Sequence, residues 1–169
     1  MGHLFGPVPS RRLGRSLGVD LIPSKTCPYD CIYCEVGPTT RQTRKRFSYR
    51  TQAIIAELAE HLKGPGAAPD VITLAGSGEP TLNLGLGRII QAIKEMTRIP
   101  VAVLTNGALL YLPEVRRELA PADIILPSLD AAREKTYHAI NRPLPELTLE
   151  SLLEGLAALH REFRGQVWL

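Results

Sequence analysis

Short apolar runs alternate with longer amphipathic segments along most of the chain. A continuous apolar run predicts a strand that is covered on both faces of its sheet. The predicted strands cover residues 16–22, 71–75, 101–104, 124–126 and 166–169.

The segments between these strands place apolar residues three and four positions apart, which predicts amphipathic helices. In residues 51–63 the isoleucines and leucines share one face. Thr51 can cap the start of this helix, and Gly64-Pro65 can end it. Further helices are predicted over residues 83–96, 113–120, 130–140 and 149–163, the last of them capped by Thr148.

Successive strand–helix units predict an α/β fold with a parallel sheet and right-handed crossovers. Two architectures have this pattern, an open doubly wound sheet and a (βα) barrel, complete or partial, and the pattern does not separate them. Residues 166–169 only begin a strand. We therefore expect the chain to be a fragment of a longer protein, truncated after four to five units. A short edge strand at a natural terminus is the alternative.

Length and composition indicate one globular domain over residues 1–169, with a basic, Gly/Pro-rich extension at 1–15. The chain has 169 residues, of which 44% are hydrophobic and 22% charged, and this balance excludes a disordered chain. No apolar run approaches the roughly 20 residues that cross a bilayer, and no signal peptide is visible. These features predict a cytoplasmic protein with no membrane partner.

The positive charge is concentrated in the first fifty residues, which hold nine Lys/Arg against three Asp/Glu. Such an excess suits a phosphate-bearing substrate, RNA or an acidic electron-donor protein. Arg11 and Arg12 are the best candidates for phosphate contacts, because guanidinium groups bind phosphate through two hydrogen bonds. A solvated loop surface is the alternative interpretation.

Cysteines occur only at Cys27, Cys31 and Cys34, and this odd, clustered set predicts a metal site rather than disulfides. Thiolates bind iron–sulfur clusters, zinc or Cu(I). Structural zinc and a [4Fe–4S] cluster both usually take four ligands. With three thiolates, one iron of such a cluster keeps an open position where a small molecule can bind. A non-catalytic electron-transfer cluster and a zinc-stabilised RNA-binding module remain as alternatives.

Polar motifs follow three of the predicted strands. Gly76-Ser77-Gly78-Glu79 follows residues 71–75, Asn106 follows 101–104, and Ser128 and Asp130 follow 124–126. Because the carboxyl ends of parallel strands meet at one edge of the sheet, these residues and the cysteines are expected around one ligand. Ordinary turn chemistry explains each motif equally well when it is taken alone.

The spacing Cys27-x3-Cys31-x2-Cys34 resembles that of the radical S-adenosylmethionine (SAM) enzymes, and Tyr33 stands where that family usually has an aromatic residue. The motif from Gly76 to Pro80 is similar to the family's glycine–glutamate motif. The opening Gly6–Gly18 resembles one subgroup, which is similar in part to the radical SAM enzymes of wybutosine formation in tRNA. The resemblance implies a partial (βα) barrel of the radical SAM type.

The resemblance also implies a role for each matching residue. Cys27, Cys31 and Cys34 would bind a [4Fe–4S] cluster, and the cluster's fourth iron would bind SAM. The segment Gly76, Ser77, Gly78 and Glu79 would bind the methionine amino group, although Ser77 replaces a more usual glycine. Tyr33 would lie against the adenine. Asn106, Ser128 and Asp130 would contact the ribose or the methionine carboxylate. Arg142 could reach the SAM carboxylate, and a loop arginine in solvent is the alternative interpretation.

The activity implied is that of an iron–sulfur enzyme. The reduced cluster would cleave SAM to methionine and a 5′-deoxyadenosyl radical, and this radical would abstract hydrogen from an unidentified substrate. A flavodoxin or a ferredoxin would supply the electron. The substrate class stays open between RNA, a protein side chain and a small metabolite.

Overall fold

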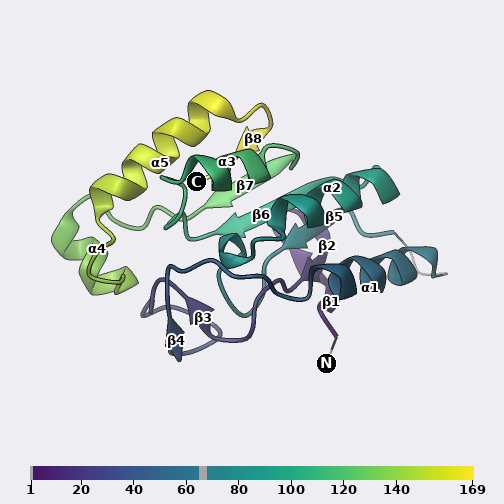
Figure 1. The fold of residues 1–169 in the computed structure, drawn as a ribbon, viewed down its shortest axis with the longest axis horizontal. Coiled ribbons are helices and arrows are strands. Elements are labelled where there is room, and N and C mark those ends of the chain that lie inside the picture. The colour runs from purple at the N-terminus through teal and green to yellow at the C-terminus, as the bar shows by residue number, and fades with distance from the viewer. Residues whose placement is uncertain (1, 65–67) are drawn as a thin grey trace.

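The main feature of the computed structural model, which describes residues 2–64 and 68–169, is a six-stranded sheet (Figure 1). Its strands lie in the order β1-β2-β5-β6-β7-β8. All neighbouring strands are parallel except β1 and β2, which are antiparallel. The bounds are β1 Leu4–Ser10, β2 Gly14–Val19, β5 Val71–Leu74, β6 Val101–Thr105, β7 Ile124–Pro127 and β8 Gln166–Val167. The fold is therefore mixed α/β, as the alternating pattern predicts.

The strand order follows the chain order without a reversal. A doubly wound sheet reverses its strand order at a switch point, where its ligand binds. The described strands therefore form a singly wound sheet, and the doubly wound alternative is wrong. A second, small sheet pairs β3 (Thr26–Cys27) with β4 (Arg41–Gln42) beside the main one.

The helices lie close to the predicted ranges. They are α1 Thr51–Lys63, α2 Leu86–Met96, α3 Pro113–Leu119, α4 Glu134–Asn141 and α5 Leu149–Glu162, with a short 3-10 helix, η1, at Pro80–Leu82. Thr148 caps α5, because its side chain accepts a hydrogen bond from the Ser151 backbone. Thr51 does not cap α1: it is the first helical residue, and Arg50 occupies the cap position. Gly64 follows α1 as predicted, and Pro65 lies outside the described residues.

Apolar side chains between the sheet and four of the helices form one continuous core. Alternate strand residues supply one side of it, among them Leu17, Ile72 and Val103, all fully buried. Residues of α1, α2, α3 and α5 supply the other side, including Leu58, Ile90, Val115 and Leu159. No helix among the described residues is both long and apolar enough to cross a membrane.

Several elements differ from the sequence prediction. The strand predicted over residues 16–22 is β2, Gly14–Val19, and the helix predicted from Asn83 begins at Leu86. The strands β3 and β4 and the helix η1 have no counterpart in the prediction.

The stretch 1–15 contains β1, which lies at the sheet edge, where proline does not interrupt a central ladder. The helix predicted from Asp130 begins only at Glu134. Asp130 instead accepts hydrogen bonds from Tyr33 and Asn141, and residues 128–133 belong to no helix or strand.

The position of α5 can be tested with two leucines of that helix. Leu159 is 1% exposed in the core, whereas Leu153 is 46% exposed. We expect Leu159→Ala to lower the free energy of unfolding by about 2–5 kcal/mol, because it removes packed methyl groups and leaves a cavity. Leu153→Ala should change it by less than about 0.5 kcal/mol. Urea denaturation of the cofactor-free chain measures both, and equal losses would contradict this packing.

Candidate functional site

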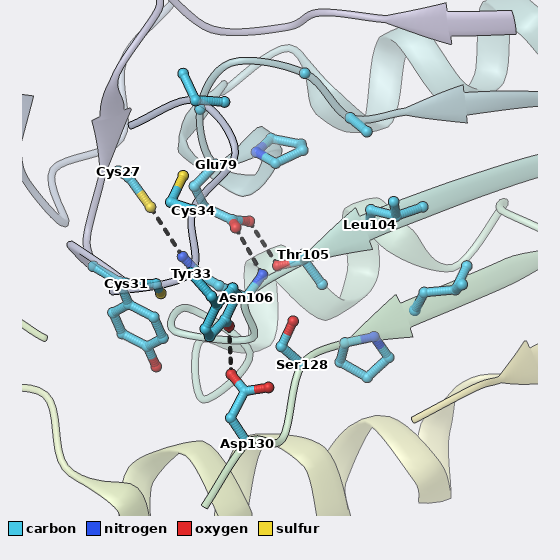
Figure 2. Close-up of a pocket in the computed structure, with 18 of the residues that line it drawn as sticks. Cys27, Cys31, Tyr33, Cys34, Glu79, Leu104, Thr105, Asn106, Ser128 and Asp130 are labelled. Atoms are coloured by element: carbon cyan, nitrogen blue, oxygen red, sulfur yellow. Dashed lines mark hydrogen bonds between the residues drawn. The ribbon is translucent and has the colours of Figure 1, made fainter. Parts of the chain in front are cut away.

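A cavity of about 520 Å³ opens at the carboxyl ends of the parallel strands (Figure 2). Eleven of the residues predicted from the sequence to bind the cluster or SAM line it. They are Cys27, Cys31, Tyr33, Cys34, Gly76, Ser77, Gly78, Glu79, Asn106, Ser128 and Asp130. Arg142 does not line the cavity, and its side chain lies 3.7 Å from the Asp30 carboxylate. The sheet thus brings together motifs that are far apart in the sequence.

The three cysteines are free thiols on one loop, which begins in β3. Among the described residues, no three His, Cys, Asp or Glu side chains are arranged to hold a single metal ion. Burial raises the pKa of the Cys27 thiol to about 12, and the nearby Glu79 carboxylate adds to this effect. Burial also raises the pKa of Cys31. The metal-free thiols of Cys27 and Cys31 are therefore protonated near neutral pH, and binding a metal to them must release protons.

The glycine-containing loop is shaped by Asp20, a residue that the sequence analysis missed. The Asp20 carboxylate accepts hydrogen bonds from the backbone nitrogen and the hydroxyl of Ser77, at 3.1 and 2.5 Å. Gly76 has φ 152°, and a Cβ there would lie 2.5 Å from Asp20 Cγ. A Cβ on Gly78 would lie 2.5 Å from the Thr26 carbonyl oxygen. Both glycines are thus required for the close approach of this loop to its neighbours.

Glu79 is 3% exposed and accepts four hydrogen bonds within the protein. Thr81 donates from its backbone and its hydroxyl, and the Thr105 hydroxyl donates at 2.6 Å. The Asn106 backbone nitrogen donates at 2.8 Å. Burial raises the pKa of Glu79, whereas these hydrogen bonds favour its charged form. This carboxylate therefore fixes Asn106, whose side-chain nitrogen lies 3.2 Å from the Cys27 sulfur.

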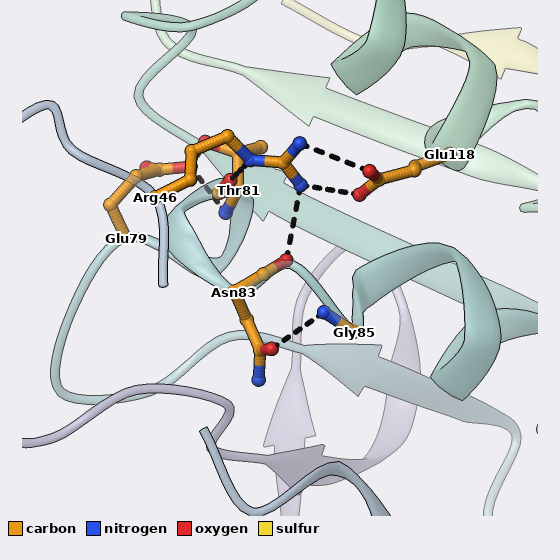
Figure 3. A network of polar contacts seen from close by, with 6 residues as sticks. All are labelled: Arg46, Glu79, Thr81, Asn83, Gly85 and Glu118. Atoms are coloured by element: carbon orange, nitrogen blue, oxygen red, sulfur yellow. Dashed lines mark hydrogen bonds and ion pairs between the residues drawn. The ribbon is translucent and has the colours of Figure 1, made fainter. Parts of the chain in front are cut away.

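Arg46 holds the segment that follows Glu79 (Figure 3). Its guanidinium donates to the carbonyl oxygens of Thr81 and Asn83, at 2.8 and 3.1 Å. It also forms a bidentate ion pair with the Glu118 carboxylate of α3. The Arg46 side chain is only 9% exposed. This member of the basic stretch therefore has a structural role.

Tyr33 and Asp130 form the wall of the cavity that lies opposite Glu79. The Tyr33 hydroxyl donates to Asp130 Oδ2 at 2.5 Å, and the Asn141 amide donates to the same oxygen at 2.7 Å. The sequence analysis missed Asn141, as it did Asp20. Neither belongs to a recognisable motif, and each contacts the site through partners distant in sequence.

Several known proteins are similar to this chain in sequence. The chain is 46% identical to a protein named GTPase Obg from Brachyspira hyodysenteriae, over 99% of this chain and 25% of that protein. It is 38% identical to UPF0026 protein MJ1312 from Methanocaldococcus jannaschii, over 96% of this chain and 51% of that protein. It is 23% identical to S-adenosyl-L-methionine-dependent tRNA 4-demethylwyosine synthase of Oryza sativa subsp. japonica, over 98% of this chain and 27% of that protein.

A solved structure, the crystal structure of archaeal TYW1, has a similar fold. The TM-score is 0.58 and the identity 19%, over 90% of this chain and 54% of that one. The chain thus spans a quarter to about half of the proteins named here. Residues 21–169 match the family model of the radical SAM superfamily, so the cysteine loop, the Glu79 loop and every strand after β2 fall inside the match. The chain belongs to the radical SAM superfamily.

Proposed function

We propose that this chain is the core of an enzyme that binds a [4Fe–4S] cluster and SAM in the cavity at the carboxyl edge of the sheet. The cluster, when bound and reduced, supplies an electron for cleaving SAM to methionine and a 5′-deoxyadenosyl radical, which abstracts hydrogen from a substrate. The described strands would then be part of a (βα) barrel. The observation that carries the proposal is that the predicted cluster and SAM residues, apart from Arg142, converge on one cavity.

The residues present fit a cluster of this kind. Three free thiols from one loop line the cavity, and thiolates are the ligands that iron–sulfur clusters take. Asn106 directs an amide toward the Cys27 sulfur, and Asn141 directs one toward the Cys31 sulfur. Such N–H donors stabilise the negative charge of ligating sulfurs. Cys27, Cys31 and Cys34 are therefore the proposed cluster ligands.

The rest of the cavity supplies groups that suit a nucleoside and an amino acid. Tyr33 presents a half-exposed aromatic ring, against which an adenine can stack. Asp130 uses Oδ2 for its bonds to Tyr33 and Asn141, which leaves Oδ1 for a ligand hydroxyl. The loop Gly76–Glu79 brings backbone polar groups to the cavity wall, where they can bind the methionine amino group. Ser128 and Asn106 lie between these two walls.

We expect alanine substitution of Cys27, Cys31 or Cys34 to abolish cluster binding, because the chain offers no other thiol. Iron and sulfide analysis after anaerobic reconstitution measures this loss. Ile32→Ala is the matched control, since Ile32 lies in the same loop and is 58% exposed. In the wild-type chain, the EPR signal of the reduced cluster should change shape when SAM is added.

Two results would contradict the cluster proposal. Zinc bound without sulfide would favour a zinc-stabilised module. A reduced cluster whose EPR signal does not change when SAM is added would favour an electron-transfer protein.

Gly78→Ala tests the proposed SAM loop. The added methyl group would collide with the Thr26 carbonyl oxygen, next to Cys27, and push the two loops apart. We expect SAM to bind at least about tenfold more weakly to the reconstituted variant, a loss of about 1.4 kcal/mol measured by equilibrium binding. Ile32→Ala is the control, because Ile32 is 58% exposed and lies outside the Gly76–Glu79 loop. Unchanged SAM affinity in Gly78→Ala would refute this role for the loop.

The cavity wall also suggests a class of substrate. Arg12 and Lys25 line the cavity, and neither forms an ion pair within residues 2–64 and 68–169. Two free cations at a cavity favour an anionic substrate or partner. RNA is the phosphate-bearing substrate that we propose to test first, since one relative is named as a tRNA-modifying synthase. An acidic flavodoxin or ferredoxin is the proposed electron donor.

Arg12→Ala and Arg11→Ala form a matched pair, because both arginines are exposed on the β1–β2 turn and only Arg12 lines the cavity. We expect Arg12→Ala to weaken binding of unmodified tRNA. The slope of log affinity against log salt concentration should become shallower by about the amount that one phosphate contact contributes. Arg11→Ala should have the smaller effect. Affinities measured at several salt concentrations decide this, and no change in either variant would exclude phosphate recognition at this turn.

A further inference from the structure

The end of α4 holds the cysteine loop through the backbone. Asp30 and Ile32 flank Cys31, and their backbone nitrogens donate to the carbonyl oxygens of Asn141 and Ile140, at 3.1 and 2.9 Å. Further along, the Leu144 nitrogen donates to the Pro28 carbonyl oxygen at 3.1 Å. The position of Cys31 is therefore set by a segment more than a hundred residues away in the chain.

The Asn141 side chain lies between this loop and the wall formed by Tyr33 and Asp130. It is 3% exposed, and its nitrogen lies 2.7 Å from Asp130 Oδ2, 3.5 Å from the Cys31 sulfur and 3.4 Å from the Tyr33 oxygen. A primary amide carries two hydrogens. The nitrogen thus has two hydrogens for these three acceptors, of which the Asp130 carboxylate is the nearest.

We propose that Asn141 is a positioning residue that joins the Cys31 sulfur to the nucleoside side of the cavity through its single amide. This inference rests on the proposed function, because it assumes a cluster on Cys31. A hydrogen bond to a ligating sulfur stabilises the more negative, reduced state and so raises the reduction potential of the cluster. The same amide holds Asp130, whose Oδ1 accepts no hydrogen bond from the residues that the structure describes.

The Asn141 amide therefore affects both the reduction potential of the cluster and the arrangement of Asp130 and Tyr33. Losing it should make the cluster harder to reduce and should also release Asp130 and Tyr33 from their present arrangement. A residue that only stabilises the fold would change the reduction potential no more than any other loosening of the loop does. The potential of the cluster in the absence of SAM is the readout that separates these roles.

The experiment compares Asn141→Ala and Asn141→Leu with wild-type protein, all reconstituted anaerobically and titrated by EPR without SAM. Leucine branches at Cγ as asparagine does and has no donor, so it keeps the site filled if the alanine variant is unstable. We expect both variants to shift the reduction potential to more negative values and to bind SAM several-fold more weakly. Tyr137→Phe is the control. It removes a 2.7 Å hydrogen bond between the same helix and Tyr29 of the same loop, but Tyr137 makes no sulfur hydrogen bond among those found in the described residues.

The outcomes separate this inference from the proposed function. Wild-type protein that takes up no cluster overturns the proposed function and the inference with it. A cluster whose potential is the same in wild-type, Asn141→Ala and Asn141→Leu protein overturns the inference alone. So does an equal shift in Tyr137→Phe, because it would mean that any loosening of the loop changes the potential. A shift in the two Asn141 variants alone supports the proposal.

Discussion

The arrangement of the cavity depends on the hydrogen bonds that the buried Glu79 carboxylate accepts. Burying a carboxylate is costly unless hydrogen bonds replace its water, and here four donors do so. These donors come from η1 and from the end of β6, so satisfying the charge brings those two segments together. The Glu79 backbone nitrogen also bonds to the Thr26 carbonyl oxygen, which connects the same residue to the cysteine loop.

Around this contact, residues at or near helices and strands hold each loop of the cavity in place. Asp20, directly after β2, holds Ser77, and Arg46 joins the chain after Glu79 to α3. The end of α4 holds the loop around Cys31. Cofactor sites need this kind of support, because ligands are oriented by the groups behind them. The residues expected to touch a cofactor are therefore only part of the site.

Much of this could be predicted from the sequence. The range of α1 and the cap at Thr148 follow from local patterns, because helix periodicity and capping depend on nearby residues. The parallel sheet follows from the alternation of strands and helices. The strand β1 could not be predicted, since its glycine and proline residues disfavour a strand and only pairing with β2 creates one.

The sequence by itself determined the family, the cysteine spacing and the polar residues at the strand ends, because these are properties of short segments. It also determined that those strand ends would meet, since parallel strands bring their carboxyl ends to one edge. Only the tertiary structure decided which donors satisfy Glu79, and that Arg12 rather than Arg11 lines the cavity. It also decided that Asn141 lies beside Cys31. Hydrogen bonds between residues so distant in the chain depend on the packing of whole elements, and no local pattern encodes that packing.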